Sequence, residues 1–230
     1  MVTGQDVTNL TMMLRHGTEI RGTITFDGNQ MPEPSDLERL LVTTSQLNLT
    51  PFEQRGRSDG NVEADGSFDL DDIGSGPRLI RLNRPPDGLL LKAVYVEGRD
   101  VIDTPLDFGA RQIISGVQLL LTDRITELTG MVHDDRGDAL TEFTVIAFAT
   151  DEALWQPQSR HIMASRPDQN AQYRTRGLPP GDYLLSAIEV VQQGEWFNPL
   201  FLEELRQRAA HVTLRDGESK ALNLGLETPW

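Results

Sequence analysis

A turn rich in glycine and proline, followed directly by a strand, constrains the fold more than any other part of the sequence. Gly177 and Gly181 can adopt positive φ, while Pro179 and Pro180 fix φ at about −65°. Aromatic and aliphatic side chains then recur at every second position over residues 182–187. This period of two is typical of a half-buried antiparallel strand. The segment therefore predicts a β-sheet architecture and says little about a reaction.

The composition is that of a globular protein with an acidic surface. The chain has 230 residues, which is enough for one large β domain or two domains of ordinary size. With 21 basic and 35 acidic residues, its net charge is 21 − 35 = −14. A field of this sign repels phosphate backbones and anionic lipid surfaces, so we expect no nucleic-acid partner.

The sequence also excludes several kinds of site and segment. It contains no cysteine, so it can form neither a disulfide framework nor a thiolate metal site. No apolar run approaches the roughly 18 residues that a membrane-spanning helix needs, so we expect no membrane insertion. Residues 1–15 lack the basic start and the apolar block of a signal peptide.

Two stretches, residues 18–28 and 126–137, share one pattern, which indicates a duplication. Each reads as a strand that contains a glycine and ends in an Asp/Gly turn. Alignment of the two places Gly22 on Gly130. A glycine inside a strand indicates a bulge or the close approach of another backbone.

Three strands of alternating sequence mark the ends of the repeated units. They span residues 10–14, 117–121 and 222–226. The last two would close domains of residues 17–125 and 126–230. Residues 1–16 are then either the closing strand of a preceding repeat or a strand added to the edge of the first domain. Within the repeat, residues 85–96 are matched with residues 181–190.

One segment departs from the all-β pattern. Asn198 is a favourable N-cap, and Pro199 is favoured at the first helical position. Phe201 and Leu205 are four residues apart and form an apolar stripe. We expect one short helix, over about residues 199–209, packed against the second domain.

The order of these turns and strands resembles that of the carboxypeptidase regulatory-like domain, a transthyretin-like (prealbumin-like) β-sandwich. The matching pieces of the second copy are residues 127–137, the strand ending at Tyr173, residues 177–183 and residues 221–226. The first copy is more degenerate, with residues 74–77 in place of the proline turn. The resemblance implies an all-β protein of two tandem antiparallel seven-stranded Greek-key sandwiches, with one short helix in the second domain.

The resemblance also implies a role. Paired repeats of this kind are similar to those of exported, largely uncharacterised bacterial proteins. They imply a non-catalytic module without a cofactor, acting as a spacer or a protein-interaction domain of a larger exported protein. Its partners would be other domains of the same polypeptide or a separate protein. Its location would be periplasmic, cell-surface or secreted, with the signal sequence outside this chain.

The polar residues form no recognisable catalytic or metal-binding motif. His16, His133, His161 and His211 lack HExxH and i, i+4 spacing, so we interpret them as surface or turn residues. The acidic residues of 65–72 alternate with apolar ones and read as the solvated face of a strand. We therefore predict neither an enzyme nor a metal site.

Aromatic and polar residues in two expected loops are the candidate contacts for a ligand or partner. The candidates are Trp155, Gln158, Arg160, Trp196 and Phe197. An exposed aromatic face beside polar side chains suits a sugar ring, so carbohydrate binding is the alternative function. In the competing interpretation, Trp196 and Phe197 hold the helix on the sandwich, and Trp155 packs beneath its loop.

Overall fold

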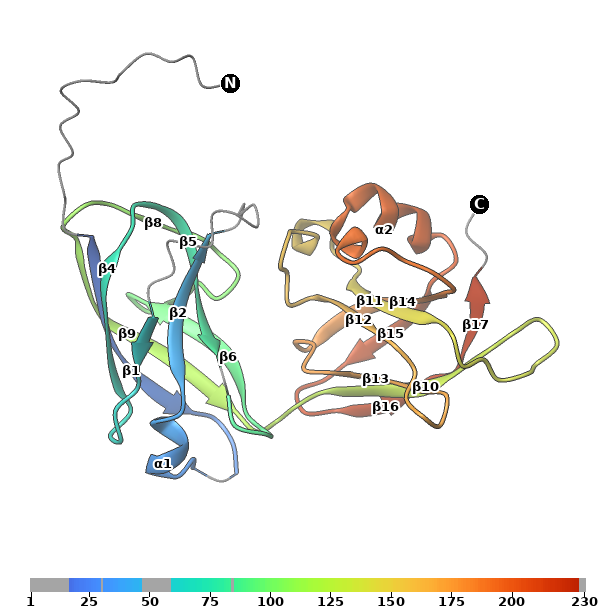
Figure 1. Ribbon diagram of the computed structural model, residues 1–230, viewed down its shortest axis with the longest axis horizontal. Coiled ribbons are helices and arrows are strands. Elements are labelled where there is room, and N and C mark those ends of the chain that lie inside the picture. Colours follow the sequence, from blue (N-terminus) through green and yellow to red (C-terminus); the bar gives the residue numbers. More distant parts are fainter. Residues whose placement is uncertain (1–16, 30, 47–58, 84, 228–230) are drawn as a thin grey trace, which may run out of the picture.

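The computed structural model describes residues 17–29, 31–46, 59–83 and 85–227. These residues form two groups of strands, joined by a connection of residues 123–126 (Figure 1). We call residues 17–122 the N-terminal half and residues 127–227 the C-terminal half. The described chain is mostly β with short helices, which confirms the expected class at this level. The strand expected within residues 1–16 lies outside the described residues.

The N-terminal half consists of two facing sheets. Its strands are β1 (Thr18–Phe26), β2 (Leu41–Gln46), β3 (Asp59–Asn61), β4 (Ser67–Ile73), β5 (Gly76–Asn83), β6 (Leu90–Val96), β7 (Arg99–Asp100), β8 (Leu106–Phe108) and β9 (Ile113–Thr122). One sheet has the order β4-β1-β9-β6-β7, and the other has the order β3-β2-β5-β8. Ile20 and Leu119 of the first sheet share one apolar cluster with Val42 and Ile80 of the second. The two sheets therefore enclose a common core, as in a sandwich.

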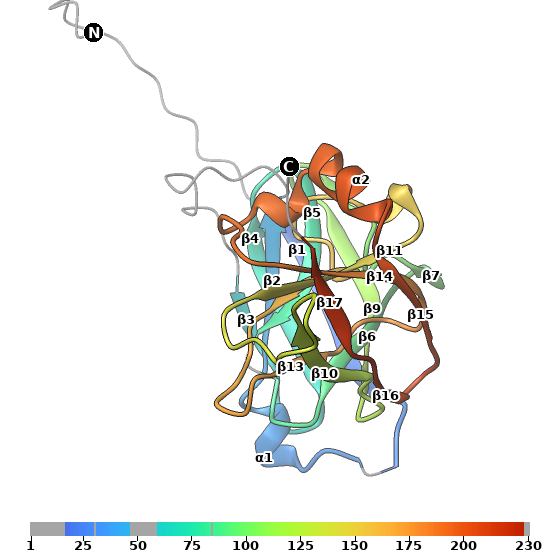
Figure 2. The same cartoon turned by 90° about the vertical axis from the view of Figure 1, so that its right-hand side faces the viewer.

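The strands of the C-terminal half form one connected sheet, in which β17 lies between β14 and β10 (Figure 2). Its strands are β10 (Glu127–His133), β11 (Thr144–Ala149), β12 (Ile162–Ser165), β13 (Gln172–Arg176), β14 (Gly181–Ile188), β15 (Ala210–Leu214), β16 (Ser219–Ala221) and β17 (Leu224–Glu227). The order is β12-β11-β14-β17-β10-β13, with β15 paired to β14 and β16 to β10. Because β17 pairs with both β10 and β14, it joins what are two separate sheets in the N-terminal half.

Much of the strand order repeats between the halves. The series β4-β1-β9 corresponds to β13-β10-β16, and β3-β2-β5-β8 corresponds to β12-β11-β14-β15. Strands β5 and β14 each have eight residues and begin at a glycine with positive φ, Gly76 and Gly181. The counterpart of residues 181–188 is therefore 76–83, and the predicted match to residues 85–96 is wrong. Residues 85–96 contain β6, which with β7 is an addition to the N-terminal half.

The two aligned strand glycines have the same surroundings. A Cβ on Gly22 would lie 2.3 Å from the carbonyl oxygen of Val117 and 2.4 Å from the ring of Phe68. A Cβ on Gly130 would lie 2.0 Å from the carbonyl oxygen of Leu222 and 2.9 Å from the ring of Tyr173. In each half the closing strand and an aromatic side chain thus occupy the space of a side chain. The expected close backbone approach is confirmed at both positions.

The sheets are mixed, which corrects the expectation of purely antiparallel pairing. The opening strand of each half pairs in parallel with the closing strand, β1 with β9 and β10 with β16 and β17. This follows from the winding of the chain, because the closing strand returns beside the opening strand in the same direction. The described strands number nine and eight in the two halves, compared with the seven expected for each, because β6 and β7 are added and the closing stretch of the C-terminal half is split.

The predicted helix is present, although shorter than expected. Helix α2 (Pro199–Arg206) starts where expected, and the Asn198 side chain accepts a hydrogen bond from the backbone N–H of Leu200 at 3.0 Å. It ends three residues early because strand β15 begins at Ala210. A second helix, α1 (Pro34–Leu37), was not predicted, and the 3₁₀ turns η1 (Glu152–Leu154) and η2 (Glu195–Phe197) complete the set. No described helix is long and apolar enough to cross a bilayer.

Helix α2 explains why one strand is more buried than its sequence predicts. The alternation over residues 182–187 predicted a half-buried strand, yet β14 is buried on both faces from Tyr183 to Ile188. Its inner face packs in the core, and its outer face carries Leu184 into a second apolar cluster with Leu202 and Leu205 of the helix. The helix that follows β14 along the chain thus covers a face that was expected to meet water.

Candidate functional site

Trp155 is part of the core. Its side chain is 6% exposed, and its indole Nε1 donates a hydrogen bond to the carbonyl oxygen of Ala149 at 2.7 Å. The ring packs edge-on against Phe148 with centroids 5.6 Å apart, and the guanidinium of Arg206 lies 4.6 Å from its centroid. This geometry fits the interpretation in which Trp155 packs beneath its loop, and it leaves no open indole face for a sugar.

The other four candidates are divided between two places. Trp196 and Phe197 lie in η2, partly buried against the cluster that helix α2 covers, with ring centroids 6.1 Å apart. This placement fits the interpretation in which they hold the helix in place. Gln158 is exposed in the loop after η1, and Arg160 follows it. The structure therefore does not assemble the five candidates into one site.

Arg160 instead joins the two halves of the molecule. Its Nε lies 3.0 Å from Oδ1 and 2.9 Å from Oδ2 of Asp103, which belongs to the N-terminal half. Its Nη1 donates a further hydrogen bond to the carbonyl oxygen of Lys92 at 3.2 Å. The Arg160 and Asp103 side chains are 27% and 29% exposed, so this ion pair is only partly screened by solvent.

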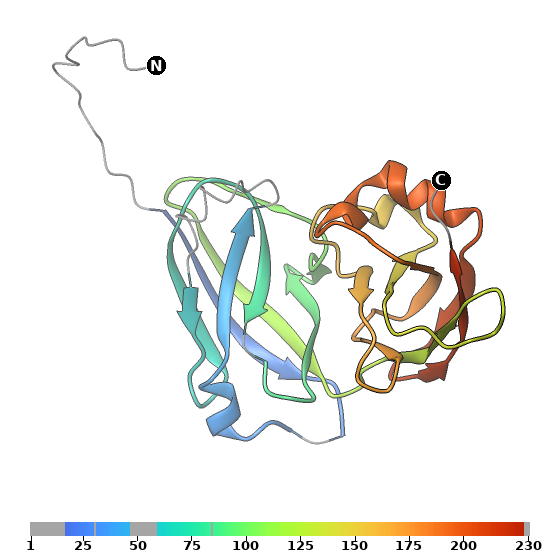
Figure 3. The same cartoon turned by 45° about the vertical axis from the view of Figure 1, so that its right-hand side comes forward.

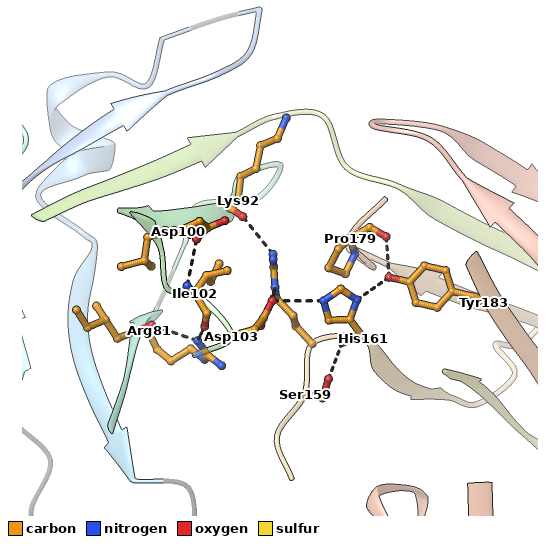
Figure 4. A network of polar contacts seen from close by, with 12 residues as sticks. Arg81, Lys92, Asp100, Ile102, Asp103, Ser159, His161, Pro179 and Tyr183 are labelled. Atoms are coloured by element: carbon orange, nitrogen blue, oxygen red, sulfur yellow. Dashed lines mark hydrogen bonds and ion pairs between the residues drawn. The ribbon is translucent and has the colours of Figure 1, made fainter. Parts of the chain in front are cut away.

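His161 extends this contact into the C-terminal half (Figure 4). Its Nε2 lies 3.3 Å from Asp103 Oδ2, and its Nδ1 lies 3.1 Å from the hydroxyl oxygen of Tyr183. That hydroxyl donates to the carbonyl oxygen of Pro179 at 2.7 Å. The chain of contacts thus runs from a loop of one half to the proline turn of the other. Burial raises the pKa of Tyr183 above its ordinary range, so its phenol keeps its proton.

The N-terminal side of this contact is held by its own hydrogen bonds. Asp100 Oδ1 accepts the backbone N–H groups of Val94 and Ile102, each at 3.1 Å. The Nη1 of Arg81 donates to the carbonyl oxygen of Ile102. Burial lowers the pKa of Arg81, and the charge of Asp103 opposes that shift. These bonds fix the turn that presents Asp103 to the other half.

A second ionic cluster joins the halves on the side of the connecting segment. Lys92 Nζ lies 2.7 Å from Asp27 of the N-terminal half and 2.9 Å from Asp216 of the C-terminal half. Arg124, in the connection, lies 3.5 Å from each of the same two carboxylates. The hydrogen bond from Lys92 holds the pKa of Asp27 below its usual value. The bonds to Asp216 and Asp27 raise the pKa of Lys92.

A groove of about 340 Å³ lies between the halves, with members of both ionic clusters in its walls. Leu90 and Leu91 of β6 line one side, and residues 177–180 line the other. A Cβ on Gly177, whose φ is +86°, would lie 2.8 Å from a methyl carbon of Leu90. The turn that dominates the sequence pattern therefore also packs against the neighbouring half. Figure 3 shows the two halves next to each other.

Sequence reasoning missed this interface almost completely. Asp103 and His161 are 58 residues apart and belong to no motif, and His161 was interpreted as a surface or turn residue. Its side chain is only 13% exposed. Among the candidate contacts singled out from the sequence, Arg160 alone proved to form hydrogen bonds across this interface. Among the described residues, no group of three His, Asp or Glu side chains is placed to hold a metal ion.

No protein-family model matches the chain, and no curated protein matches it in sequence. Among solved structures, it is remotely similar to the TIE protein of Bacillus anthracis, with 11% identity, a TM-score of 0.30, and coverage of 92% of this chain and 33% of that one. A minor pilin of Streptococcus agalactiae has 11% identity and a TM-score of 0.33, covering 92% and 97%. The shaft pilin spaA of Lactobacillus rhamnosus GG has 11% identity and a TM-score of 0.32, covering 93% and 99%. The chain spans about a third of the length of the first of these, and similarities this weak support no conclusion about function.

Proposed function

We propose that the chain is a non-catalytic pair of β-sandwich domains, residues 17–125 and 126–230, that serves as a spacer or protein-interaction module of a larger exported bacterial protein. The observation that carries this proposal is that the polar side chains between the halves bind one another across the interface. Asp103, Arg160 and His161 neutralise and hydrogen-bond one another across the interface. Side chains that could serve in acid–base chemistry here hold the two halves together.

The repeated strand order supports the division into two domains. Seven strands of the N-terminal half have counterparts in the C-terminal half, and the surroundings of Gly22 and Gly130 match. A transthyretin-like Greek-key winding for each domain belongs to the same proposal. The Tyr183 hydroxyl, bonded to the carbonyl oxygen four residues upstream, fixes the proline turn as tyrosine corners do in other sandwiches.

A spacer must transmit orientation, and the interface is suited to that task. The connection between β9 and β10 is only residues 123–126, so it leaves the halves little room to separate. The Lys92 cluster lies beside this connection, and the Asp103 cluster contacts the proline turn. Two separate points of attachment resist rotation better than one.

The proposal is tested by measuring whether the halves reorient as one body. Backbone ¹⁵N relaxation of the full chain at about pH 6 should give one rotational correlation time for both halves. The double substitution Asp103→Ala with Asp216→Ala should separate the two values. Asp87→Ala with Asp135→Ala, at two exposed turn positions, is the matched control and should change nothing. Independent tumbling of the halves in the unmodified chain would contradict a spacer role.

The alternative function, carbohydrate binding through Trp155 and Trp196, is not supported at Trp155. Trp155 makes a T-shaped contact with Phe148, has Arg206 over its ring and is 6% exposed, so a sugar could stack there only after the loop unfolds. Trp196 is partly buried against the helix cluster. A spacer or protein-interaction role therefore suits these aromatic positions better than carbohydrate binding does.

A further inference from the structure

The partners of the two ring nitrogens of His161 are the Tyr183 hydroxyl and the Asp103 carboxylate. The Tyr183 hydroxyl has one proton, and the carbonyl oxygen of Pro179, 2.7 Å away, can only accept it. The hydroxyl oxygen is then an acceptor toward His161 Nδ1, 3.1 Å away. On the other side of the ring, the Asp103 carboxylate that pairs with Arg160 also has only lone pairs to offer. Both ring nitrogens therefore face acceptors, and only the doubly protonated imidazolium satisfies both contacts.

We propose that His161 is a protonation-dependent clasp, which joins Asp103 of the N-terminal half to the Tyr183–Pro179 turn of the C-terminal half as an imidazolium and loosens when it loses a proton. A neutral ring protonated on Nδ1 turns a lone pair toward the Asp103 carboxylate. A neutral ring protonated on Nε2 keeps Asp103, but the Tyr183 hydroxyl must then turn its proton away from Pro179. Either neutral form loses one of the three contacts.

The charged groups around the ring make this clasp conditional. On the C-terminal side it has Arg160 as its neighbour in sequence and the neutral phenol of Tyr183. On the N-terminal side it faces Asp103, and Arg81 lies close enough to interact electrostatically with both Asp103 and Arg160. Three cations, including His161 itself, thus gather around one carboxylate. Of these side-chain types, only histidine has an ordinary pKa near neutral pH.

The acid limit of the clasp is set by Asp103. Burial alone would raise its pKa, but the hydrogen bond from His161 and the charge of Arg160 outweigh burial and leave the pKa of Asp103 below its usual value. A carboxylate whose pKa is lowered on folding contributes stability above its unfolded pKa, and the contribution is lost as pH falls through the folded value. The clasp is therefore strongest in mildly acidic solution, where Asp103 is ionised and His161 is protonated.

The clasp is tested on the full chain by combining two measurements. Because the chain has no cysteine, Asp87→Cys and Asp135→Cys provide one label in each half for an interdomain distance measurement. Imidazole ¹⁵N shifts report the protonation of each ring nitrogen of His161. Between about pH 5 and 8.5, we expect one ring nitrogen to lose its proton and the ratio of closed to open molecules to fall about tenfold, the effect of losing one charge-assisted hydrogen bond. A ratio independent of pH, or a ring that is neutral throughout this range, would overturn the proposal.

Variants separate the clasp from a general effect of pH. His161→Gln keeps polar atoms at the interface but cannot titrate, so its closed-to-open ratio should not change over the same range. His211→Gln, at an exposed position on β15, should leave the pH dependence intact. If His161→Gln fails to fold, Tyr183→Phe serves instead, because without the hydroxyl a neutral ring protonated on Nε2 loses no partner. If either His161→Gln or Tyr183→Phe kept the full pH response, the clasp would be ruled out.

Discussion

The two halves cover the same sheet face in different ways. In the C-terminal half, the outer face of β11 and β14 is covered by helix α2, which the chain inserts between β14 and β15. In the N-terminal half, the corresponding insertion between β5 and β8 is the β6–β7 hairpin. That hairpin extends the opposite sheet and leaves the outer face of β5 to the neighbouring half. Leu79 and Arg81 on this face line a hollow of about 30 Å³ whose other wall is formed by residues 153, 154 and 156–159.

This difference shows how similar strand orders acquire different degrees of independence. The C-terminal half buries its second apolar cluster with residues of its own sequence. The N-terminal half completes its burial partly with the loop that precedes Arg160 and with the bonds to Asp103. We therefore expect one half to be self-sufficient and the other to depend on its neighbour.

Expressing the two halves as separate fragments should have the largest effect on the free energy of unfolding. Residues 17–125 alone would expose Leu79 and lose the hydrogen bonds of Asp103 to the other half. Burial of a leucine side chain contributes about 1.5–3 kcal/mol, and a charge-assisted hydrogen bond contributes about the same. We expect the free energy of unfolding of this fragment to fall by roughly 3–6 kcal/mol, measured by urea denaturation against the full chain.

The fragment of residues 126–230 provides the contrast. Because α2 covers its sheet from within, this fragment should lose only the hydrogen bonds that Arg160 and His161 make to Asp103, so its free energy of unfolding should fall by about 1.5–3 kcal/mol, less than that of the other fragment. Equal losses in the two fragments would contradict the asymmetry between the halves.

Truncation of Leu202, which packs between α2 and the sheet, should cause the next largest loss of unfolding free energy. Leu202 is fully buried between α2 and the sheet, so Leu202→Ala should cost about 2–5 kcal/mol by leaving a cavity. Leu200, on the same helix, is 76% exposed, and Leu200→Ala should stay within about 0.5 kcal/mol. Thermal denaturation of the 126–230 fragment measures both. A small loss for Leu202→Ala would mean that the helix is a passive cover.

The corner before β5 and the corner before β14 are fixed by different chemistry at equivalent positions. Tyr183 donates to the carbonyl oxygen of Pro179, and Arg78 donates from Nε to the carbonyl oxygen of Gly74 at 2.9 Å. Both bonds reach four residues back along the chain. Arg78 is 4% exposed, and this burial lowers its pKa. A charged donor should be the more costly to remove.

Substitution at these corners tests that ranking. Arg78→Met should cost about 1.5–3 kcal/mol, because it removes a charged hydrogen bond. Tyr183→Phe should cost about 0.5–1.5 kcal/mol, because the phenol is neutral. Urea denaturation of the full chain, followed by signals specific to each half, compares the two. The reverse order would show that the proline turn depends more on its side-chain bond than the glycine turn does.

The sequence predicted features that depend on neighbouring residues. The Asn198-Pro199 start gave the helix, and the glycines at positions 22 and 130 gave the points of close backbone approach, because each signal is local. It could not predict that β6 would be an addition, since its alternation is that of any strand. It also could not predict that Asp103 would meet His161, since that contact depends on the relative placement of the halves.

The candidate ligand contacts also show that sequence neighbours do not reveal long-range contacts. Trp155 lies in an expected polar loop, but it is buried in the apolar cluster that includes Phe148 and Leu202, with Arg206, 51 positions later, over its ring. Arg160 was selected for its polarity beside Trp155 and proved to contact the other half. The sequence identified aromatic and polar side chains that could make contacts, and the tertiary fold determined which residues they contact.

The smallest expected effect concerns the two ionic clusters, which should respond differently to pH and to added salt. Lys92, whose pKa is raised by Asp216 and Asp27, contributes below its unfolded pKa and loses that contribution only as pH rises through the folded value. Asp27, whose pKa is lowered by Lys92, contributes above its unfolded pKa and loses it as pH falls through the folded value. Between about pH 5 and 8.5 this cluster keeps its charges, whereas the His161 contact changes. Added salt should weaken the Lys92 cluster, because its side chains are about one-third exposed.

Lys92→Met should therefore reduce the salt dependence of the interdomain distance and leave its pH dependence unchanged. Exposed ion pairs contribute little, so the unfolding free energy should hardly change. Lys220→Met is the matched control, because Lys220 pairs with Glu218 inside the C-terminal half and does not reach the interface. If Lys92→Met removed the pH response instead, the two clusters would act as one unit, and the assignment of that response to His161 alone would be wrong.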